Sequence, residues 1–425
     1  MSSKGSPQTD VAVVGAGPAG LAAAAVAAES GARVRLIDSG GRPGGQIWRH
    51  GDQYPAPRVA RAWMRRFQLS GAEWTPHTTV VDIPAPGVLH VARNGKGGMI
   101  TARSVVIATG ARELFLPFPG WTRPNVMGAG GAQALLKGGL NVRGRRVVVS
   151  GSGPLLLPVA AAMRDAGASV VCVAEQVSAA RLLRFSAGLW RSPAKLALAA
   201  RYGARIPVGR YRPGTWVARA DGEMGVETVT LTDGRRKWTE RCDLVCCSYG
   251  LVPSTELAQL AGCRVARGRV VVDERQQTTV EGVFSAGEAT GVAGDQAALV
   301  EGEIAGLAAA GALTRAKARR LRGLQSAARR FANELEVAFL PRREVLELAL
   351  PDTIVCRCED VDFGQLDRRW TGRQAKLYSR VGMGPCQGAV CGGAVERIFG
   401  WEAPSARPPL FGPPLGAWMT DADVE

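Results

Sequence analysis

The strongest constraint on the fold is a strand, turn, helix and strand pattern near the start of the 425-residue chain. Residues 10–38 read as an apolar strand, a glycine turn, an alanine-rich helix and a second strand that ends in an acid. Gly15 permits a tight turn, Gly17 lets the backbone approach a pyrophosphate, and Gly20 lets helix and strand pack closely. Asp38 is spaced to bind a ribose hydroxyl. The pattern predicts a dinucleotide site with phosphates at the helix N-terminus.

The same pattern recurs at residues 146–175, where Gly151 and Gly153 form the turn and Glu175 takes the acidic position. Leu156 replaces the third glycine. Two interpretations stay open: a site for NAD(P) or another adenine nucleotide, or a domain that keeps the fold without productive binding. Glu175 in the ribose position disfavours a 2′-phosphate, so NAD is preferred over NADP if either binds.

Two further segments indicate how the domains are connected. Residues 104–120 form an apolar strand that ends in Ala-Thr-Gly before a proline-rich crossover, and residues 283–313 repeat strand, glycine turn and small-residue helix. Residues 10–313 resemble two-dinucleotide flavoproteins of the glutathione and thioredoxin reductase class, in which the first signature closes the FAD domain before an insertion and the second resumes it. We therefore predict an α/β fold with two Rossmann-like domains of the glutathione and thioredoxin reductase type. The expected limits are 1–115 with 250–325 for a discontinuous FAD domain, 116–249 for an NAD-like domain, 326–350 for a linker, 351–401 for a small domain and 402–425 for a tail.

The cysteines outside the C-terminal region do not suit disulfide chemistry. No Cys-x2-Cys or Cys-x4-Cys pair occurs in the first 150 residues. Cys246 and Cys247 are adjacent in an apolar strand, which places them on opposite faces and favours buried core thiols. The only histidines are His50, His77 and His90, so a histidine triad or a multi-histidine metal site is disfavoured.

Four cysteines near the C-terminus have the spacing of metal ligands. They form two close pairs within 36 residues, separated by a long spacer and surrounded by glycines. Glycines leave backbone N–H groups free to approach sulfur, which tunes an iron-sulfur cluster. Cys-x-Cys is a poor zinc-knuckle spacing, so a [2Fe-2S] cluster is favoured, while zinc and unmetallated thiols remain as alternatives. The predicted ligands are Cys356, Cys358, Cys386 and Cys391.

Charge and hydropathy limit the partners. The net charge of +16 would suit nucleic acid, but the basic residues are scattered without interleaved aromatic residues, so we expect no nucleic-acid binding. Anionic cofactors, an acidic partner subunit or a solvated arginine-rich surface explain the charge instead. No apolar run reaches the roughly 18 residues of a membrane span, and residues 1–10 lack a signal-peptide core. We expect no membrane span and a cytoplasmic location.

Five segments together resemble the alpha-type subunits of heteromeric flavin dehydrogenases. They read VRLIDSGGRPGGQIWR, ATGARELFLPFPGWTRPNVMGAGGAQ, GSGPLLLPVAAAMRDAG, GEATGVAGDQAALVEGEIAGLAA and CRCEDV with GMGPCQGAVC. This group includes the A-type subunit of opine oxidase, the B-type subunit of hydrogen cyanide synthase and the alpha subunit of D-hydroxyproline dehydrogenase, with sarcosine oxidase alpha more distant. The resemblance spans residues 10 to about 401.

The resemblance implies FAD and a BFD-like [2Fe-2S] domain in this chain, and a separate FAD-containing beta subunit that binds and oxidises the substrate. Some relatives add FMN at the subunit junction, ATP in the second nucleotide domain or a small third subunit. Ala389 replaces the arginine usual between the last two cysteines, and Glu288 replaces a frequent aspartate. The implied FAD-binding positions are Gly15, Gly17, Gly20, Asp38, Arg42, Gly45, Gln46, Val80, Thr109, Gly110, Gly287, Glu288, Gln296 and Ala297.

These observations predict an electron-transferring flavin and iron-sulfur subunit of an enzyme that oxidises an amino acid or opine C–N bond. D-hydroxyproline, an opine and related amines are not separated by the sequence. No residue set for orienting such a substrate can be recognised in the chain, so no catalytic residue is assigned. The alternatives are a stand-alone NADH-dependent reductase of a small electron carrier and a scaffold subunit with vestigial motifs.

Overall fold

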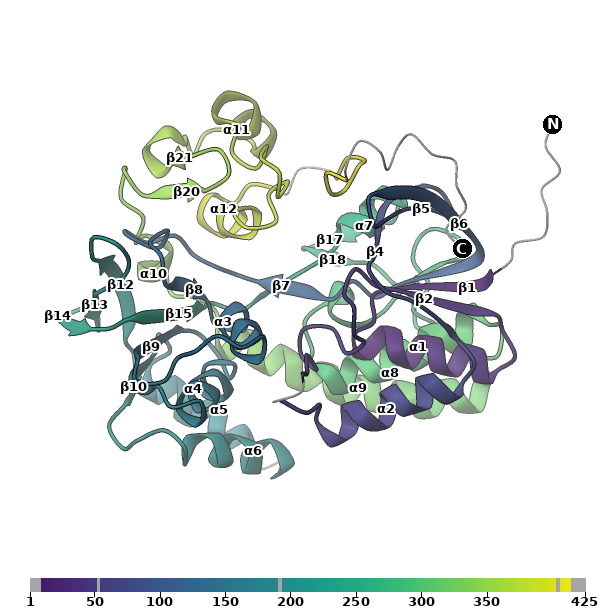
Figure 1. Cartoon of the computed structure of the whole chain (residues 1–425), viewed down its shortest axis with the longest axis horizontal. Coiled ribbons are helices and arrows are strands. Elements are labelled where there is room, and N and C mark those ends of the chain that lie inside the picture. Colours follow the sequence, from purple (N-terminus) through teal and green to yellow (C-terminus); the bar gives the residue numbers. More distant parts are fainter. Residues whose placement is uncertain (1–8, 52–53, 190–192, 403–405, 414–425) are drawn as a thin grey trace. The chain divides into compact units, whose positions relative to one another are not determined.

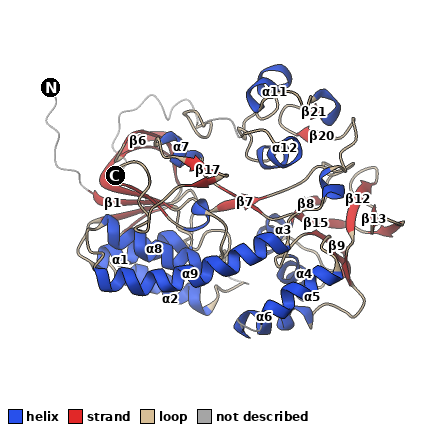
Figure 2. Cartoon of the chain, turned by 180° about the vertical axis from the view of Figure 1, so that it is seen from behind, coloured by secondary structure: helices blue, strands red, loops and turns tan. Residues whose placement is uncertain are grey.

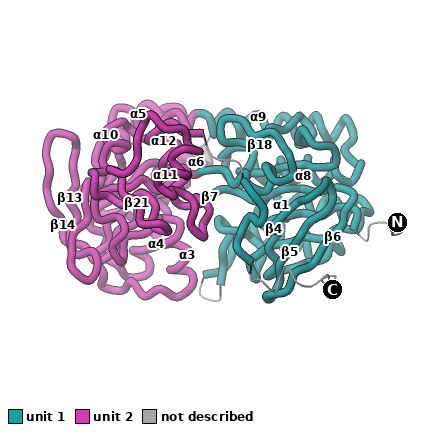
Figure 3. Tube along the Cα trace, turned by 90° about the horizontal axis from the view of Figure 1, so that it is seen from above, with its two compact units in different colours: residues 1–112, 252–333, 405–425 teal, residues 113–251, 334–404 magenta. Residues whose placement is uncertain are grey.

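The computed structural model describes residues 9–51, 54–189, 193–402 and 406–413, without the side chains of 193 and 194. The chain divides into two compact units (Figure 3). Unit 1 comprises Met1–Arg112, Val252–Asn333 and Ser405–Glu425, and unit 2 comprises Glu113–Leu251 and Glu334–Pro404. The nucleotide-domain limits expected at 115 and 250 lie close to the divisions observed after 112 and 251. The expected linker, 326–350, is divided after Asn333, so its first part belongs to unit 1 and the rest to unit 2.

Unit 1 is built on one sheet of order β3-β2-β1-β6-β5-β4, with β19 pairing β6 (Figure 1). The long strand β6 pairs antiparallel with β5 along its first half and parallel with β1 along its second half. β19 comes from the segment after the insertion. It pairs with β6 and adds a further parallel strand to the sheet. The strands are β1 (Thr9–Val14), β2 (Val34–Ile37), β3 (Glu73–Thr75), β4 (Thr78–Ala85), β5 (Val88–Arg93), β6 (Lys96–Ile107), β17 (Val265–Ala266), β18 (Arg269–Val270) and β19 (Val283–Ser285).

One face of this sheet is covered by helices, of which α1 and α8 pack directly on each other (Figure 2). A Cβ atom added to Gly302 of α8 would lie 2.1 Å from the carbonyl oxygen of Ala19, and one added to Gly306 would lie 2.3 Å from that of Ala23. Only glycine therefore fits at these two positions. The helices of unit 1 are α1 (Pro18–Glu29), α2 (Arg58–Leu69), α7 (Glu256–Leu260), η2 (Gly287–Thr290), α8 (Asp295–Ala309) and most of α9 (Arg315–Ala338).

Helix α9 starts in the range expected for the FAD domain and ends in the expected linker, 326–350. Its Leu321 is buried and packs with Val26, Ile304 and Leu307, so the first part of the helix contributes to the core of unit 1. Among the described residues, no helix is long and apolar enough to cross a membrane.

Unit 2 contains a second parallel sheet of order β11-β10-β9-β15-β8 and an antiparallel meander of β12, β13 and β14. Cys246 and Cys247 lie in the interior strand β15 and are completely buried, as the apolar strand pattern predicted. All nine cysteines are free thiols. The elements are β8 (Val126–Gly128), α3 (Ala129–Lys137), β9 (Arg146–Gly151), α4 (Leu156–Asp165), β10 (Ser169–Glu175), α5 (Ala179–Gly188), α6 (Pro193–Gly203), β11 (Tyr211–Pro213), β12 (Trp216–Asp221), β13 (Thr228–Thr232), β14 (Lys237–Arg241) and β15 (Leu244–Ser248), and the chain passes between the units through β7 (Ala111–Glu113) and β16 (Leu251–Pro253).

The C-terminal part of unit 2 is a small module with a core of its own. Its core contains Cys356, Cys391 and Trp401, and the Trp401 ring stacks on Phe399 at 4.3 Å. The indole N–H of Trp121, in the nucleotide fold of the same unit, donates to the Ile354 carbonyl at 2.6 Å. The elements are α10 (Arg343–Leu346), β20 (Ile354–Cys356), β21 (Val361–Asp362), η3 (Phe363–Gln365), α11 (Gly372–Ser379) and α12 (Gly392–Phe399).

Replacing glycine by alanine should have opposite effects on stability at Gly306 of α8 and at Gly323 of α9. Gly306→Ala places a methyl group against the Ala23 carbonyl and should lower the free energy of unfolding by about 1–3 kcal/mol. Gly323 is an exposed position of α9, and a Cβ added there meets no atom within 4 Å. Gly323→Ala should therefore raise the free energy of unfolding by about 0.5–1 kcal/mol. Urea unfolding followed by circular dichroism measures both. Equal effects of the two substitutions would contradict the packing argument.

Candidate flavin and thiol sites

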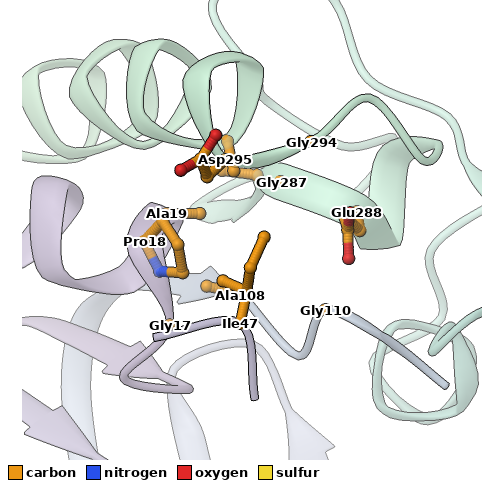
Figure 4. Close-up of a pocket in the computed structure, with 12 residues that line it drawn as sticks. Gly17, Pro18, Ala19, Ile47, Ala108, Gly110, Gly287, Glu288, Gly294 and Asp295 are labelled. Carbon is orange, nitrogen blue, oxygen red and sulfur yellow. The ribbon is translucent and has the colours of Figure 1, made fainter. Parts of the chain in front are cut away.

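A pocket in unit 1 lies at the carboxyl ends of β1, β6 and β19, where nucleotides bind in parallel sheets (Figure 4). Four parts of the chain line it: the turn into α1, the loop at Ile47, the segment after β6, and the stretch from Ala286 to Ala298. Of the residues expected to hold FAD, it brings together Gly17, Gly110, Gly287 and Glu288. The insertion therefore separates two halves of one pocket in the sequence.

The three glycines of the first turn have different physical roles. Gly15 has φ +104°, and a Cβ there would lie 2.3 Å from the Ala108 carbonyl oxygen. A Cβ on Gly20 would lie 1.7 Å from the Gly15 oxygen, so both residues are glycine because the protein packs against them. Gly17 is different, because a Cβ there meets no protein atom within 4 Å. Its open side is where a ligand can approach the backbone.

Asp38 stabilises the same turn. Its carboxylate accepts hydrogen bonds from the backbone N–H groups of Ala16 and Gly40, each at 2.6 Å. The side chain is half-buried at the end of β2, beside the first glycine turn. Asp38 thus links the loop after β2 to the first glycine turn.

The remaining expected FAD positions lie around the pocket without lining it. Gly45 is close to the turn, since a Cβ on it would lie 2.9 Å from Gly17 Cα. The Thr109 hydroxyl donates to the Ser254 carbonyl at 2.7 Å. Val80 and Ala297 are buried, whereas Arg42, Gln46 and Gln296 are exposed.

Two acidic residues, Glu288 and Asp295, line the pocket, and only Glu288 was predicted from the sequence. Burial raises the pKa of Glu288 above its ordinary range, although a backbone hydrogen bond from Gly294 acts in the opposite direction. Asp295 also lines the pocket and accepts a hydrogen bond from the buried Trp48 indole at 3.3 Å. Asp295 was missed, and its position in the first turn of α8 was the available signal.

The second glycine turn, in unit 2, begins like the first but differs at its second glycine and in its surroundings, because φ is +105° at Gly153 and −71° at Gly17. Gly151 has φ +141°, and a Cβ there would lie 1.7 Å from the Ser248 carbonyl oxygen. Glu175 is fully buried and accepts hydrogen bonds from the N–H groups of Gly153 at 2.9 Å and Val177 at 3.0 Å. Burial raises the pKa of Glu175 to about 7. The acid in the ribose position is thus bonded to the protein's own backbone.

A segment of the expected linker, Phe339–Arg342, lies against this second turn. The Ser152 hydroxyl donates to the Phe339 carbonyl at 2.7 Å. The Gln176 side chain donates to the Leu340 carbonyl at 3.1 Å and accepts from the Arg342 N–H at 3.1 Å. The Phe339 ring is the nearest group in front of Gly153, at 3.9 Å from a Cβ built there. The sequence did not indicate these contacts.

The four C-terminal cysteines are arranged as two hydrogen-bonded pairs, Cys356 with Cys391 and Cys358 with Cys386. The first pair is buried, and in the second pair Cys358 is exposed. A Cβ on Gly384 would lie 2.2 Å from Cys358 Cβ, so glycine is required where the two cysteine segments meet. Across the described residues, no three His, Cys, Asp or Glu side chains are arranged as a ready metal site.

The surroundings of Cys356 favour a thiolate. The hydrogen bond from the Cys391 thiol lowers the pKa of Cys356 to about 5 against the opposing effect of burial. Backbone N–H groups of Gly382, Glu359 and Cys358 also donate to this sulfur. The pKa of Cys391 is correspondingly raised by the same pairing.

Comparison with known families identifies the fold. Residues 9–312 match the pyridine nucleotide-disulphide oxidoreductase family. The chain belongs to this family of FAD-binding oxidoreductases. The match ends before the cysteine-rich module, which therefore lies outside the region common to the family.

Several relatives match over nearly the whole chain. The A-type subunit of opine oxidase from Agrobacterium tumefaciens (strain Ach5) is 33% identical over 94% of this chain and 87% of that protein. The HcnB subunit of hydrogen cyanide synthase from Pseudomonas aeruginosa is 30% identical over 89% of this chain and 90% of that protein. These matches confirm the predicted resemblance to subunits of heteromeric flavin enzymes.

Solved structures share the fold. L-proline dehydrogenase from P. horikoshii superimposes with a TM-score of 0.68 at 22% identity, over 95% of this chain and 78% of that one. Thioredoxin reductase from T. acidophilum superimposes with a TM-score of 0.55 at 23% identity, over 71% of this chain and 98% of that one. The predicted thioredoxin reductase-type α/β fold is confirmed.

The first glycine turn predicts that two substitutions separate ligand binding from folding. Gly17→Ala projects into open space, so it should leave the free energy of unfolding of the flavin-free protein unchanged while weakening flavin binding by about tenfold or more. Gly20→Ala should instead lower the free energy of unfolding by about 1–3 kcal/mol. Flavin titration and urea unfolding of the flavin-free proteins provide the measurements. If Gly17→Ala bound flavin as tightly as the wild type, the cofactor could not approach the backbone at the open side of Gly17.

Proposed function

We propose that this chain is the electron-transferring FAD and [2Fe-2S] subunit of a heteromeric dehydrogenase or oxidase. A partner FAD subunit would bind an amino acid or opine and oxidise its C–N bond. The observation that carries the proposal is a four-cysteine module following a flavin fold, in a chain that aligns over 94% of its length with the A-type subunit of an opine oxidase. The substrate, whether D-hydroxyproline, an opine or a similar amine, would be selected by the partner.

The residues of the pocket suit FAD. The open side of Gly17 and the N-terminus of α1 can receive a pyrophosphate, and Asp38 stands in the ribose position. The close approach of Gly287 to Ala19 brings the second half of the pocket against the first, because a Cβ there would lie 2.8 Å from Ala19 Cβ. These residues would bind and orient the cofactor.

The thiol set suits a two-iron cluster. Two pairs of thiols come from two chain segments, and backbone N–H groups already point at Cys356. Cys356, Cys358, Cys386 and Cys391 would be the ligands. When bound, FAD supplies two-electron transfer and the cluster one-electron transfer. Exposed Cys358 places the module's edge within reach of solvent and of a partner.

The contacts of Phe339–Arg342 weigh against the NADH-dependent reductase. A dinucleotide places its pyrophosphate on the glycine turn and its ribose at the following acid. Here the Ser152 hydroxyl bonds to the Phe339 carbonyl, the Phe339 ring stands before Gly153, and Glu175 is fully buried, whereas Asp38 in the first turn is not. NAD or ATP in this second fold would need these contacts to be replaced. FMN at a subunit junction and a third small subunit remain parts of the proposal that only the assembled complex can test.

Metal analysis tests the cluster. The purified protein should contain two irons with acid-labile sulfide per chain. Cys358→Ser should lose the cluster and keep FAD, because the flavin pocket lies in unit 1. Cys263→Ser, a buried thiol of unit 1, is the matched control and should retain both. One zinc per chain would contradict the proposal.

Reconstitution tests the division of labour. The isolated chain should not oxidise D-hydroxyproline or opines in a dye-reduction assay, whereas co-expression with its partner subunits should produce this activity. Net charge of +16 is compatible with an acidic partner surface. Full substrate turnover by the single chain, or NADH oxidation at the rate of a dedicated reductase, would overturn the proposal.

A further inference from the structure

An ion pair between a buried carboxylate and a partly exposed guanidinium lies behind the flavin pocket and is used by none of the functions above. Glu301 of α8 is fully buried, and its carboxylate forms a salt bridge with Arg329 of α9 at 2.5 Å. Most other buried residues of α8 are alanine, glycine, leucine or isoleucine. Burying a carboxylate in such surroundings is costly unless it is paired and its oxygens accept hydrogen bonds, and the Arg329 side chain that pairs with it is itself 25% exposed. The contacts of the two side chains therefore show what the pair does.

Both members of the pair bind the turn η2. One Glu301 oxygen accepts the Gly287 N–H at 3.1 Å and the Thr290 hydroxyl at 3.0 Å. Arg329 donates to the Thr290 and Gly291 carbonyls, each at 3.2 Å, and to the Thr290 hydroxyl at 2.6 Å. The turn is held at its first residue by the carboxylate and at its end by the guanidinium.

The same turn forms one wall of the pocket, through Gly287 and Glu288 (Figure 4). We propose that Glu301 and Arg329 are positioning residues that fix this wall and keep the charge behind the flavin balanced. The inference rests on the proposed function only in that the pocket holds flavin.

Charge balance predicts opposite effects from removing either partner. Glu301→Gln leaves the Arg329 guanidinium without its carboxylate partner, and a nearby positive charge stabilises the electron-rich reduced flavin. Its reduction potential should rise. Arg329→Met leaves the carboxylate unpaired, so the potential should fall. The double substitution removes both charges and should return the potential toward that of the wild type.

The experiment measures the flavin reduction potential of the full chain by spectroelectrochemistry in the wild type, both single variants and the double variant. Arg322→Met is the matched control, because Arg322 lies on the same helix but pairs with Glu274 at the surface, and its potential should be unchanged. Arg329→Lys keeps the charge but has fewer donors. It should keep the potential while flavin dissociates about tenfold faster, as expected for the loss of roughly one charge-assisted hydrogen bond.

Potential shifts of the same sign in Glu301→Gln and Arg329→Met, or no shift in either, would overturn the inference. If Arg329→Met does not fold, the rise in Glu301→Gln and the separate effects in Arg329→Lys still decide it. A wild type that holds flavin but no cluster would contradict the proposed function alone. A wild type that cannot bind flavin would overturn both.

Discussion

The contact of α1 with α8 is the interaction on which the rest of unit 1 depends. These helices come from opposite ends of the discontinuous unit, and they approach so closely that the backbone of α1 touches Gly302 and Gly306. Dispersion and burial of apolar surface stabilise this contact only if no side chain separates the helices. The consequence is functional, because the start of α8 and the turn before it complete the pocket that begins at Gly17. An insertion of well over one hundred residues can therefore separate the two halves of the pocket without disrupting it.

The chain uses one motif twice with different results. In the first copy, Gly17 faces open space and Asp38 remains half-exposed at the pocket side. In the second copy, Glu175 is fully buried and the segment Phe339–Arg342 bonds to the turn. The first glycine is alike in both turns, since Gly15 and Gly151 both have positive φ and both contact a neighbouring strand end, but the second glycine differs: φ is −71° at Gly17 and +105° at Gly153. A glycine pattern thus specifies the turn, while the groups in front of it decide whether a nucleotide can reach it.

The small module illustrates how thiols can be organised by the backbone. Its core includes two of the four cysteines, so folding of the module and pairing of Cys356 with Cys391 are the same event. Gly384 brings the second cysteine segment against Cys358. A module of this size has little apolar surface to bury, and a bound cluster would add to its stability. This fits the position of two of the predicted ligands, Cys356 and Cys391, in the core of the module.

Local patterns were sufficient to predict the two Rossmann-like folds, the return of the chain to its first domain, and the close packing at Gly15 and Gly20. Each depends on backbone conformation or on contacts between adjacent strand, turn and helix, and these are encoded by residues close in the chain. The return was recognisable because residues 283–313 repeat that local signature. The contacts of Ser152 with Phe339, and of Glu301 with Arg329 and Thr290, were decided by the tertiary structure. They join a side chain to groups that neither periodicity nor spacing relates to it, and only the packing of whole helices and strands brings them within hydrogen-bonding distance.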